Sequence, residues 1–243
     1  MFPLRNFPPN TLALADMNES IIVQAPDGAP AQLFLLFHGV GADARDLEAF
    51  GERLGDAFPQ AMIVSVMAPD MADLGRGRQW FSIREINEES RPARIANALP
   101  AFISQVRFWQ KASGVGYPGT ALIGFSQGAI MALEAVHASP SVAGRVVAIA
   151  GRFGRLPDTV PQETTIHWIH GKADPVISYQ HAVEGAERVI ALGGDLTADV
   201  LPRVGHEINP EVEEVLLRRL KTYVPKRLWE AALRNAAGES GDQ

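Results

Sequence analysis

Residues Thr120–Val136 read TALIGFSQGAIMALEAV, in which an apolar run leads into a helical pattern and the join carries Gly124, Ser126 and Gly128. This G-x-S-x-G spacing is typical of a nucleophile held on a sharp strand-to-helix turn. The turn needs glycines because a Cβ atom beside the serine would clash with the adjacent strand or helix. The segment therefore predicts Ser126 as a nucleophile at a helix start, where backbone N–H groups stabilise an oxyanion. The alternative is a serine that only caps the helix, flanked by packing glycines.

Short apolar runs alternate with longer amphipathic stretches on both sides of this segment, as in a mainly parallel sheet covered by helices. The predicted fold class is α/β, with helices on both faces of the central sheet. The expected strands are 21–24, 32–37, 62–66, 121–125, 146–150, 166–169 and 197–201. The expected helices are 45–57, 91–111, 127–138, 179–192, 210–222 and 226–237. The connection 151–165 contains two prolines and no helical period, so we expect a loop there and no cap domain.

The run QLFLLFHGVGAD at residues 32–43 ends an early strand in a glycine-containing turn. In a strand-turn-helix hydrolase the second oxyanion donor comes from this loop, and the first is the residue after the nucleophile. We therefore expect the backbone N–H groups of Val40 and Gln127 to form the oxyanion hole. An ordinary βα turn is the alternative. His38 is expected to shape the loop by hydrogen bonding rather than to transfer a proton.

The acid and the base should follow Ser126 in that order, each in a loop after a later strand. Asp174 and His206 occupy such loops, in TTIHWIHGKADPVIS and LPRVGHEINP. His206 would accept the serine proton, and Asp174 would orient its ring. His170 is the substitute base if His206 fails, and an Asp-Pro turn is the structural alternative for Asp174. The weaker candidates for the acid are Asp158, Asp195 and Asp199, and the other histidines are His137, His167 and His181.

Composition narrows the function further. The 243 residues are 47% hydrophobic, carry a net charge of -6 and include no cysteine, so we expect no nucleic-acid partner, disulfide or thiolate metal site. We expect one domain at 17–237, a flexible arm or extension at 1–16 and a disordered tail at 238–243. No window has the apolar length of a spanning helix, which predicts a cytoplasmic protein without stable membrane insertion. We expect no metal and no cofactor, and the oligomeric state stays open.

The motifs together resemble the carboxylesterase/phospholipase group of α/β-hydrolases, which includes acyl-protein thioesterases and small bacterial carboxylesterases. The resemblance rests on FHGVGAD, GRQWFS, LIGFSQGA, IHGKADPVIS and VGHEI, which occur in the family's order. It implies the same triad and oxyanion donors, and it places Trp80 beside the substrate pocket. We expect His38, Phe81 and Val176 to take part in substrate binding as well.

One departure concerns arginines around GRQWFS, which form either a solvated surface or a site for an anionic headgroup or coenzyme phosphate. These residues are Arg76, Arg78, Arg84, Arg91 and Arg94.

The predicted function is a serine carboxylesterase that hydrolyses short- to medium-chain acyl esters through an acyl-enzyme. An acyl thioesterase or a lysophospholipase would use the same triad with a different pocket and leaving group. A non-catalytic hydrolase scaffold used for binding is a hypothesis of another class, and it would be marked by loss of a triad member. A peptidase is a further alternative, although no extra domain is present to gate peptides. For the carboxylesterase and for the thioesterase, the expected binding partner is a small-molecule substrate, an acyl ester or an acyl thioester.

Overall fold

The apolar runs form the strands of a seven-stranded sheet in the computed structural model, which describes residues 19–139 and 141–239. Every expected strand has its counterpart, with bounds shifted by two residues at most, so the α/β prediction is confirmed. The strands are β1 (Ile21–Gln24), β2 (Gln32–Phe37), β3 (Ala61–Val66), β6 (Thr120–Phe125), β7 (Arg145–Ile149), β8 (Thr165–Gly171) and β9 (Asp195–Leu201).

The order of the strands across the sheet is β1-β3-β2-β6-β7-β8-β9. β1 runs antiparallel to β3, and the other neighbouring strands are parallel. The carboxyl ends of β2, β6, β8 and β9 therefore meet at one edge of the sheet, which is where open α/β sheets carry their sites. The residues directly after these four strands include the predicted triad and oxyanion donors.

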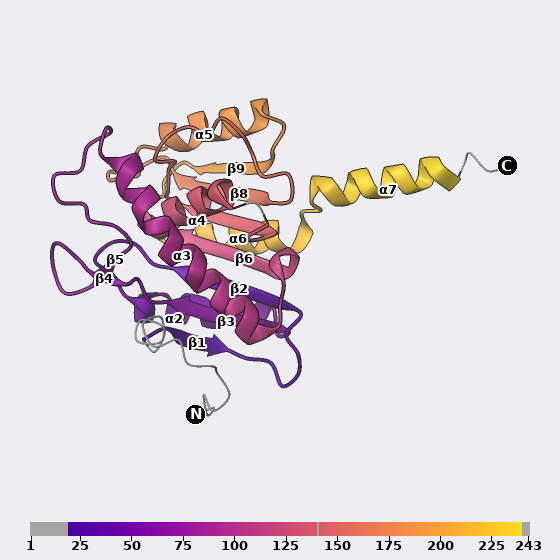
Figure 1. The fold of residues 1–243 in the computed structure, drawn as a ribbon, viewed down its shortest axis with the longest axis horizontal. Coiled ribbons are helices and arrows are strands. Elements are labelled where there is room, and N and C mark those ends of the chain that lie inside the picture. The colour runs from indigo at the N-terminus through magenta and orange to yellow at the C-terminus, as the bar shows by residue number, and fades with distance from the viewer. Residues whose placement is uncertain (1–18, 140, 240–243) are drawn as a thin grey trace.

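Helices cover both faces of the sheet, as Figure 1 shows. On one face lie α3 (Arg91–Ser113), α4 (Gln127–Ala138) and α5 (Gln180–Ala191), and on the other lie α2 (Glu48–Ala57) and α6 (Pro210–Thr222). Successive side chains of a strand point to opposite faces, so Leu35 and Phe37 enter the first core whereas Phe34 and Leu36 enter the second. Burial on both faces explains why the central strands read as continuous apolar runs.

The two strands at the sheet edges differ from this pattern. β1 and β9 are only partly buried, whereas the central strands are buried on both faces. The polar residues within β9 follow from its edge position, because one side of an edge strand has no neighbouring strand to cover it.

The structure adds a small hairpin and two 3₁₀ turns, one of which takes the place of the first turn of the helix expected at 45–57. β4 (Asp70–Met71) pairs with β5 (Arg78–Gln79) in a small hairpin, and the 3₁₀ turns η1 (Ala44–Leu47) and η2 (Tyr117–Gly119) precede α2 and β6. Residues 151–164 contain no helix or strand, in agreement with the predicted loop. No cap therefore stands between β7 and β8.

The last helix, α7 (Lys226–Glu239), extends away from the body of the molecule (Figure 1). It reaches Glu239, two residues beyond the predicted end, and the rest of the predicted tail lies outside the described residues. The predicted arm at 1–16 lies outside them as well. Among the helices that the structure describes, none combines the length and the apolar character needed to cross a bilayer.

Candidate active site

Ser126 lies between the end of β6 and the first residue of α4. Its backbone has φ 53° and ψ -115°, a positive φ that is costly for a residue with a Cβ atom. The strain is held by neighbours on both sides: the Ser126 N–H donates to Ile149 O at 2.9 Å, and its carbonyl accepts from Ile130 N at 3.1 Å. The turn therefore presents the hydroxyl at the carboxyl edge of the sheet.

The two glycines beside Ser126 allow the backbones to approach closely. A Cβ atom at Gly124 would lie 2.4 Å from Gly128 O, and a Cβ atom at Gly128 would lie 2.2 Å from Phe37 O. Real Cβ atoms do not approach backbone oxygens so closely. The G-x-S-x-G spacing is therefore a steric requirement of this turn.

Two side chains from two later loops line up with the serine. His206 Nε2 lies 2.9 Å from Ser126 Oγ, and His206 Nδ1 lies 2.7 Å from Asp174 Oδ2. The His206 ring also packs on Phe125 with centroids 4.9 Å apart. The two loops hold each other in place, because Ala173 N donates to Val204 O at 3.0 Å. The geometry is that of a hydroxyl whose proton can pass to an imidazole oriented by a carboxylate.

Asp174 is fixed by its own loop. Its Oδ1 accepts from Val176 N at 2.8 Å and from Ile177 N at 2.9 Å, and its side chain has no exposed surface. Burial opposes ionisation of this carboxyl, but hydrogen bonds from His206, Ile177 and Val176 outweigh burial and lower its pKa. Asp174 therefore stays a carboxylate at neutral pH, ready to accept from His206.

The substitute base, His170, is held away from the serine. Its Nε2 lies 2.9 Å from Ile177 O and 3.3 Å from Asp174 Oδ2, so the proton is on Nε2 and supports the Asp174 loop. Its Nδ1 is buried and has no partner among the described residues. Burial lowers the pKa of His170, which favours the neutral ring. His206 thus lies between the Asp174 carboxylate and Ser126, whereas His170 contacts the carboxylate and has no hydrogen bond with the serine.

The predicted oxyanion donors are both free to donate. Among the described residues, neither Val40 N nor Gln127 N has a hydrogen-bond acceptor, and both residues line a cavity with Ser126. The loop that carries Val40 is fixed on its other side, since Gly41 N donates to Arg78 O at 2.8 Å. Two unpaired N–H groups next to a serine hydroxyl can stabilise a tetrahedral oxyanion.

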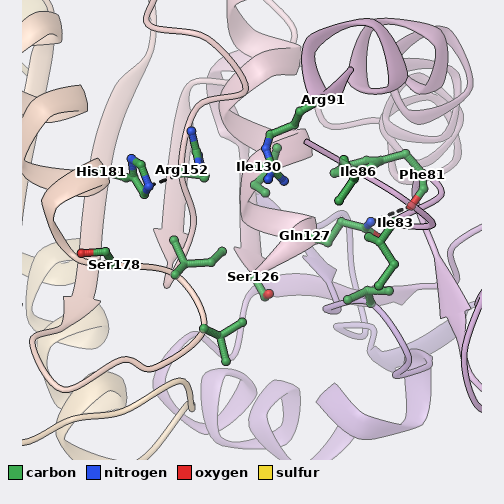
Figure 2. Close-up of a pocket in the computed structure, with 13 residues that line it drawn as sticks. Phe81, Ile83, Ile86, Arg91, Ser126, Gln127, Ile130, Arg152, Ser178 and His181 are labelled. Atoms are coloured by element: carbon green, nitrogen blue, oxygen red, sulfur yellow. Dashed lines mark hydrogen bonds between the residues drawn. The ribbon is translucent and has the colours of Figure 1, made fainter. Parts of the chain in front are cut away.

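The Gln127 side chain ties the loop that follows β5 to the nucleophile helix. Its Oε1 accepts from Trp80 N and its Nε2 donates to Phe81 O, each at 2.7 Å (Figure 2 draws the second bond). Both partners are buried, so the two bonds fix the main chain at residues 80–81. The sequence pattern predicts only a backbone role for Gln127, and nothing in it indicates that the side chain would bind the main chain at residues 80–81.

A cavity of about 290 Å³ opens from Ser126 (Figure 2). Phe81 and Val176 line it as predicted, whereas Trp80 and His38 do not. Trp80 points into the core, where it contacts Phe37 and Phe102 and donates from its indole nitrogen to His38 O at 2.9 Å. The Trp80 ring therefore supports the wall from behind and is not part of the lining, so its predicted part in substrate binding stays a prediction.

The His38 ring is held between two main-chain segments by hydrogen bonds. Its Nε2 accepts from Ala68 N at 3.2 Å and its Nδ1 donates to Gly39 O at 2.8 Å, so the ring is neutral and burial lowers its pKa. These bonds join the early loop to residue 68, in the segment that follows β3. The His38 ring is buried and does not line the cavity, which fits its expected role in shaping the loop, and its part in substrate binding stays a prediction.

Asp73 fixes the segment 82–84, which forms part of the cavity wall, by hydrogen bonds. Its Oδ2 accepts from Ser82 Oγ and Ile83 N at 2.7 Å and from Arg84 N at 3.0 Å. The hydrogen bond from Ser82 is the largest of the effects that lower the pKa of Asp73 to about 2. A carboxylate that accepts several hydrogen bonds at once fixes the turn that presents Phe81 and Ile83 to the cavity.

Sequence reasoning missed most of the cavity lining. Only Arg91 of the five arginines around GRQWFS faces the cavity, where it is joined by Arg152 from the connection after β7 and by His181 from the first turn of α5. The remaining missed residues are apolar or neutral: Ile83, Ile86, Ile130, Ile177 and Ser178. Apolar residues in loops could have signalled the wall, but nothing in the sequence joins Arg152 to Arg91. In the described part of the chain, no group of His, Asp and Glu has the arrangement of a metal site.

Comparison with known proteins shows the family of the chain. A sequence description of the phospholipase/carboxylesterase family matches residues 18–224. The chain is 45% identical to esterase YpfH of Escherichia coli over 225 residues, which cover 93% of this chain and 96% of that protein. The matched family region ends before α7.

Solved structures give the same fold. The crystal structure of esterase PE8 has a TM-score of 0.78 and 27% identity, and the match covers 84% of this chain and 97% of that one. A carboxylesterase of Bacillus cereus has a TM-score of 0.71 at 17% identity, covering 88% of this chain and 100% of its own. The second likeness concerns the fold alone.

Proposed function

Because the chain belongs to the phospholipase/carboxylesterase family of α/β-hydrolases and is a hydrolase, we propose that it cleaves carboxylic esters through an acyl-enzyme on Ser126. The observation that carries the proposal is the hydrogen-bonded series from Ser126 Oγ through His206 to Asp174, at 2.9 and 2.7 Å. A positive φ at Ser126 supports it, since a strained turn is retained where a side chain must be presented to substrate.

In the proposed reaction, Ser126 Oγ attacks the ester carbonyl carbon while His206 Nε2 takes the hydroxyl proton. Collapse of the tetrahedral intermediate breaks the carbon–oxygen bond of the ester, and His206 returns the proton to the departing alcohol. Water then attacks the acyl-enzyme with His206 again as the base, which releases the acid. Asp174 holds the Nδ1–H of His206 and stabilises the imidazolium.

The backbone N–H groups of Val40 and Gln127 are the proposed oxyanion donors. Their free N–H groups border the cavity beside Ser126, where the carbonyl oxygen of a bound ester would lie. Loss of one such donor typically lowers kcat by about 10²–10³-fold.

The proposed substrate has a short or medium acyl chain. The cavity of about 290 Å³ is walled largely by apolar side chains, among them Phe81, Ile83 and Ile130. Each buried methylene contributes about 0.8 kcal/mol, and the gain ends where the chain leaves the apolar wall. The connection at 151–164 provides no helical cap that an interface would have to open.

The test is a series of 4-nitrophenyl esters from acetate to palmitate, assayed below and above the critical micelle concentration. We expect the highest kcat/KM for butyrate or hexanoate, a decline toward palmitate, and no rise in rate as micelles form. Ser126→Ala should hydrolyse none of the esters. Preference for palmitate, or a steep increase at the micelle concentration, would contradict the proposed chain length and favour a lipid substrate.

Parallel assays with butyryl-CoA and a lysophospholipid separate the related activities. A kcat/KM for the thioester or the lysophospholipid well above that for every simple ester would replace the carboxylesterase proposal with that activity. An active Ser126→Ala enzyme would instead contradict the mechanism itself.

A further inference from the structure

The cavity has two chemically different ends. In Figure 2, Arg91, Arg152 and His181 lie on the side of the cavity away from Ser126, and Ile130 lies beside Arg91. The part near the serine is apolar, whereas the far part carries the two cations. A purely hydrocarbon acyl chain would contact the first part and leave the second without a partner.

The arginines retain hydrogen-bonding capacity. Each guanidinium has five N–H donors. Those of Arg152 meet Phe153 O, both oxygens of Glu88, and His181 Nε2. Arg91 has one bond, from Nη2 to Glu88 Oε1 at 3.3 Å, and its buried Nε has no acceptor among the described residues. The far end therefore offers donors that lack an acceptor, and most belong to Arg91.

Glu88 shows which chemistry fits the arginines. Its two oxygens lie 2.6 and 3.0 Å from Arg152 Nη2 and Nη1, a bidentate pair of a carboxylate with a guanidinium. Its side chain is 66% exposed and does not line the cavity, so it holds the arginines from the solvent side. Arg91 donates to Glu88 through Nη2 alone, so its other N–H groups can bind a second carboxylate in the cavity.

The charges leave the far end cationic. Arg152 lowers the pKa of Glu88, so the two arginines face one carboxylate at neutral pH. Burial, and then Arg152, lower the pKa of His181, so His181 adds no charge and serves as an acceptor. Glu184 lies 4.0 Å from His181 Nδ1 and is exposed to solvent. Arg91 is the first residue of α3, whose amino-terminal dipole adds positive potential.

The position of His206 indicates which part of the substrate enters the cavity. The base must return its proton to the leaving alcohol, so the alcohol lies beside His206 Nε2. Ser126, Val40 and Gln127 line the cavity, and His206 is not among the described residues that do. The cavity therefore receives the acyl part.

We propose that this enzyme is selective for esters whose acyl chain ends in a carboxylate, that is, monoesters of dicarboxylic acids, with Arg91 and Arg152 binding the free carboxylate. The inference rests on the proposed esterase function and names its substrate class. The reaction consumes the monoester and water and yields the dicarboxylate, the alcohol and one proton. The net charge of -6 disfavours anions in general, so selectivity has to come from this local pair.

The experiment compares monoethyl adipate with its primary amide, ethyl adipamate, which has nearly the same shape and no charge. Ethanol release gives kcat/KM for each, and the monoethyl esters of succinic and suberic acid test the chain length. We expect the wild type to favour the carboxylate over the amide by on the order of tenfold or more, because charge-assisted hydrogen bonds are the stronger kind. The preference should decrease as salt is added.

The variants test the residues separately. Arg91→Gln and Arg152→Gln should each lower the carboxylate-to-amide ratio to about one or below, and Glu88→Gln should raise it by removing the competing carboxylate. Arg84→Gln is the matched control, since Arg84 belongs to the same segment but is exposed and outside the cavity. Its ratio should equal that of the wild type.

The outcomes separate this inference from the function beneath it. Suppose that both esters are hydrolysed and that hydrolysis needs Ser126. A carboxylate-to-amide ratio near one in the wild type, or a ratio unchanged in both arginine variants, would then overturn the dicarboxylate proposal and leave the esterase proposal standing. Absence of hydrolysis of these and all simple esters would overturn both. A ratio equally reduced by Arg84→Gln would assign the effect to general charge and overturn the site.

Discussion

Asp174→Asn changes one carboxylate oxygen into an amide nitrogen and keeps the size of the side chain. The orientation of the amide is determined by the loop, because Oδ1 accepts from Val176 N and Ile177 N at 2.8 and 2.9 Å. The amide oxygen must take that place, and the nitrogen then faces His206 Nδ1, which lies 2.7 Å from Oδ2 in the native protein. An N–H donor there requires a lone pair on Nδ1, so the proton of His206 moves to Nε2.

The consequence for catalysis is large because His206 Nε2 lies 2.9 Å from Ser126 Oγ and can no longer accept its proton. The wrong tautomer in such a triad lowers kcat on the order of 10⁴-fold. At about 1.36 kcal/mol for each factor of ten, this is roughly 5 kcal/mol of lost transition-state stabilisation. His170 adds a structural cost, because its Nε2–H, 3.3 Å from Oδ2, would face the amide hydrogens.

The assay is kcat/KM for 4-nitrophenyl butyrate, together with thermal unfolding to show that the variant is folded. Asp199→Asn is the matched control. Asp199 lies on β9, its carboxylate accepts from Arg219 of α6 at 2.8 Å, and it has no hydrogen bond with a residue of the triad. We expect the control to keep its activity within a factor of about two. A folded Asp174→Asn protein with more than a tenth of the wild-type activity would refute the reasoning.

Three further predictions concern the residues around the site. Gly128→Ala places a Cβ atom 2.2 Å from Phe37 O, so the turn must shift; we expect activity to fall about 10²–10³-fold, and unchanged kcat/KM would show that the turn yields freely. Gln127→Leu leaves two buried main-chain groups at residues 80–81 unpaired, which should lower the free energy of unfolding by about 2–6 kcal/mol in urea titrations; a loss below about 1 kcal/mol would count against the clamp. His167 has a pKa lowered from 6.5 to about 3 by burial and then by nearby arginines, so the folded state binds fewer protons than the unfolded state between these values. The free energy of unfolding should therefore decrease as the pH falls through this range, by up to about 1.4 kcal/mol per pH unit, and His167→Gln should lack this component; identical slopes in the two proteins would contradict it.

The fold could be predicted because its strands are encoded locally. Buried parallel strands such as β2 need continuous apolar runs, and the glycines and prolines between them mark the turns. The hairpin of β4 and β5 could not be predicted, since two-residue strands have no period to detect. The polar β9 was found, but its place at the sheet edge depends on the strand order, which the sequence does not state.

The site was predictable to a different extent in each of its parts. Ser126, Asp174 and His206 each follow a strand in a fixed chain order, so parallel topology brings them together. The cavity wall follows no such rule, because it depends on which loop side chains pack inward. Trp80 faces the core and Arg152 faces the cavity, and both outcomes come from tertiary contacts that no local pattern encodes.

The most direct test of the account is labelling with a fluorophosphonate probe followed by peptide mass spectrometry. The probe phosphonylates a serine only where a base removes the hydroxyl proton and an oxyanion hole receives the oxygen. We predict one adduct, on Ser126, that is absent in Ser126→Ala and formed far more slowly in His206→Gln. An adduct on another residue, or equal labelling of Ser126→Ala, would contradict the assignment of Ser126 as the nucleophile.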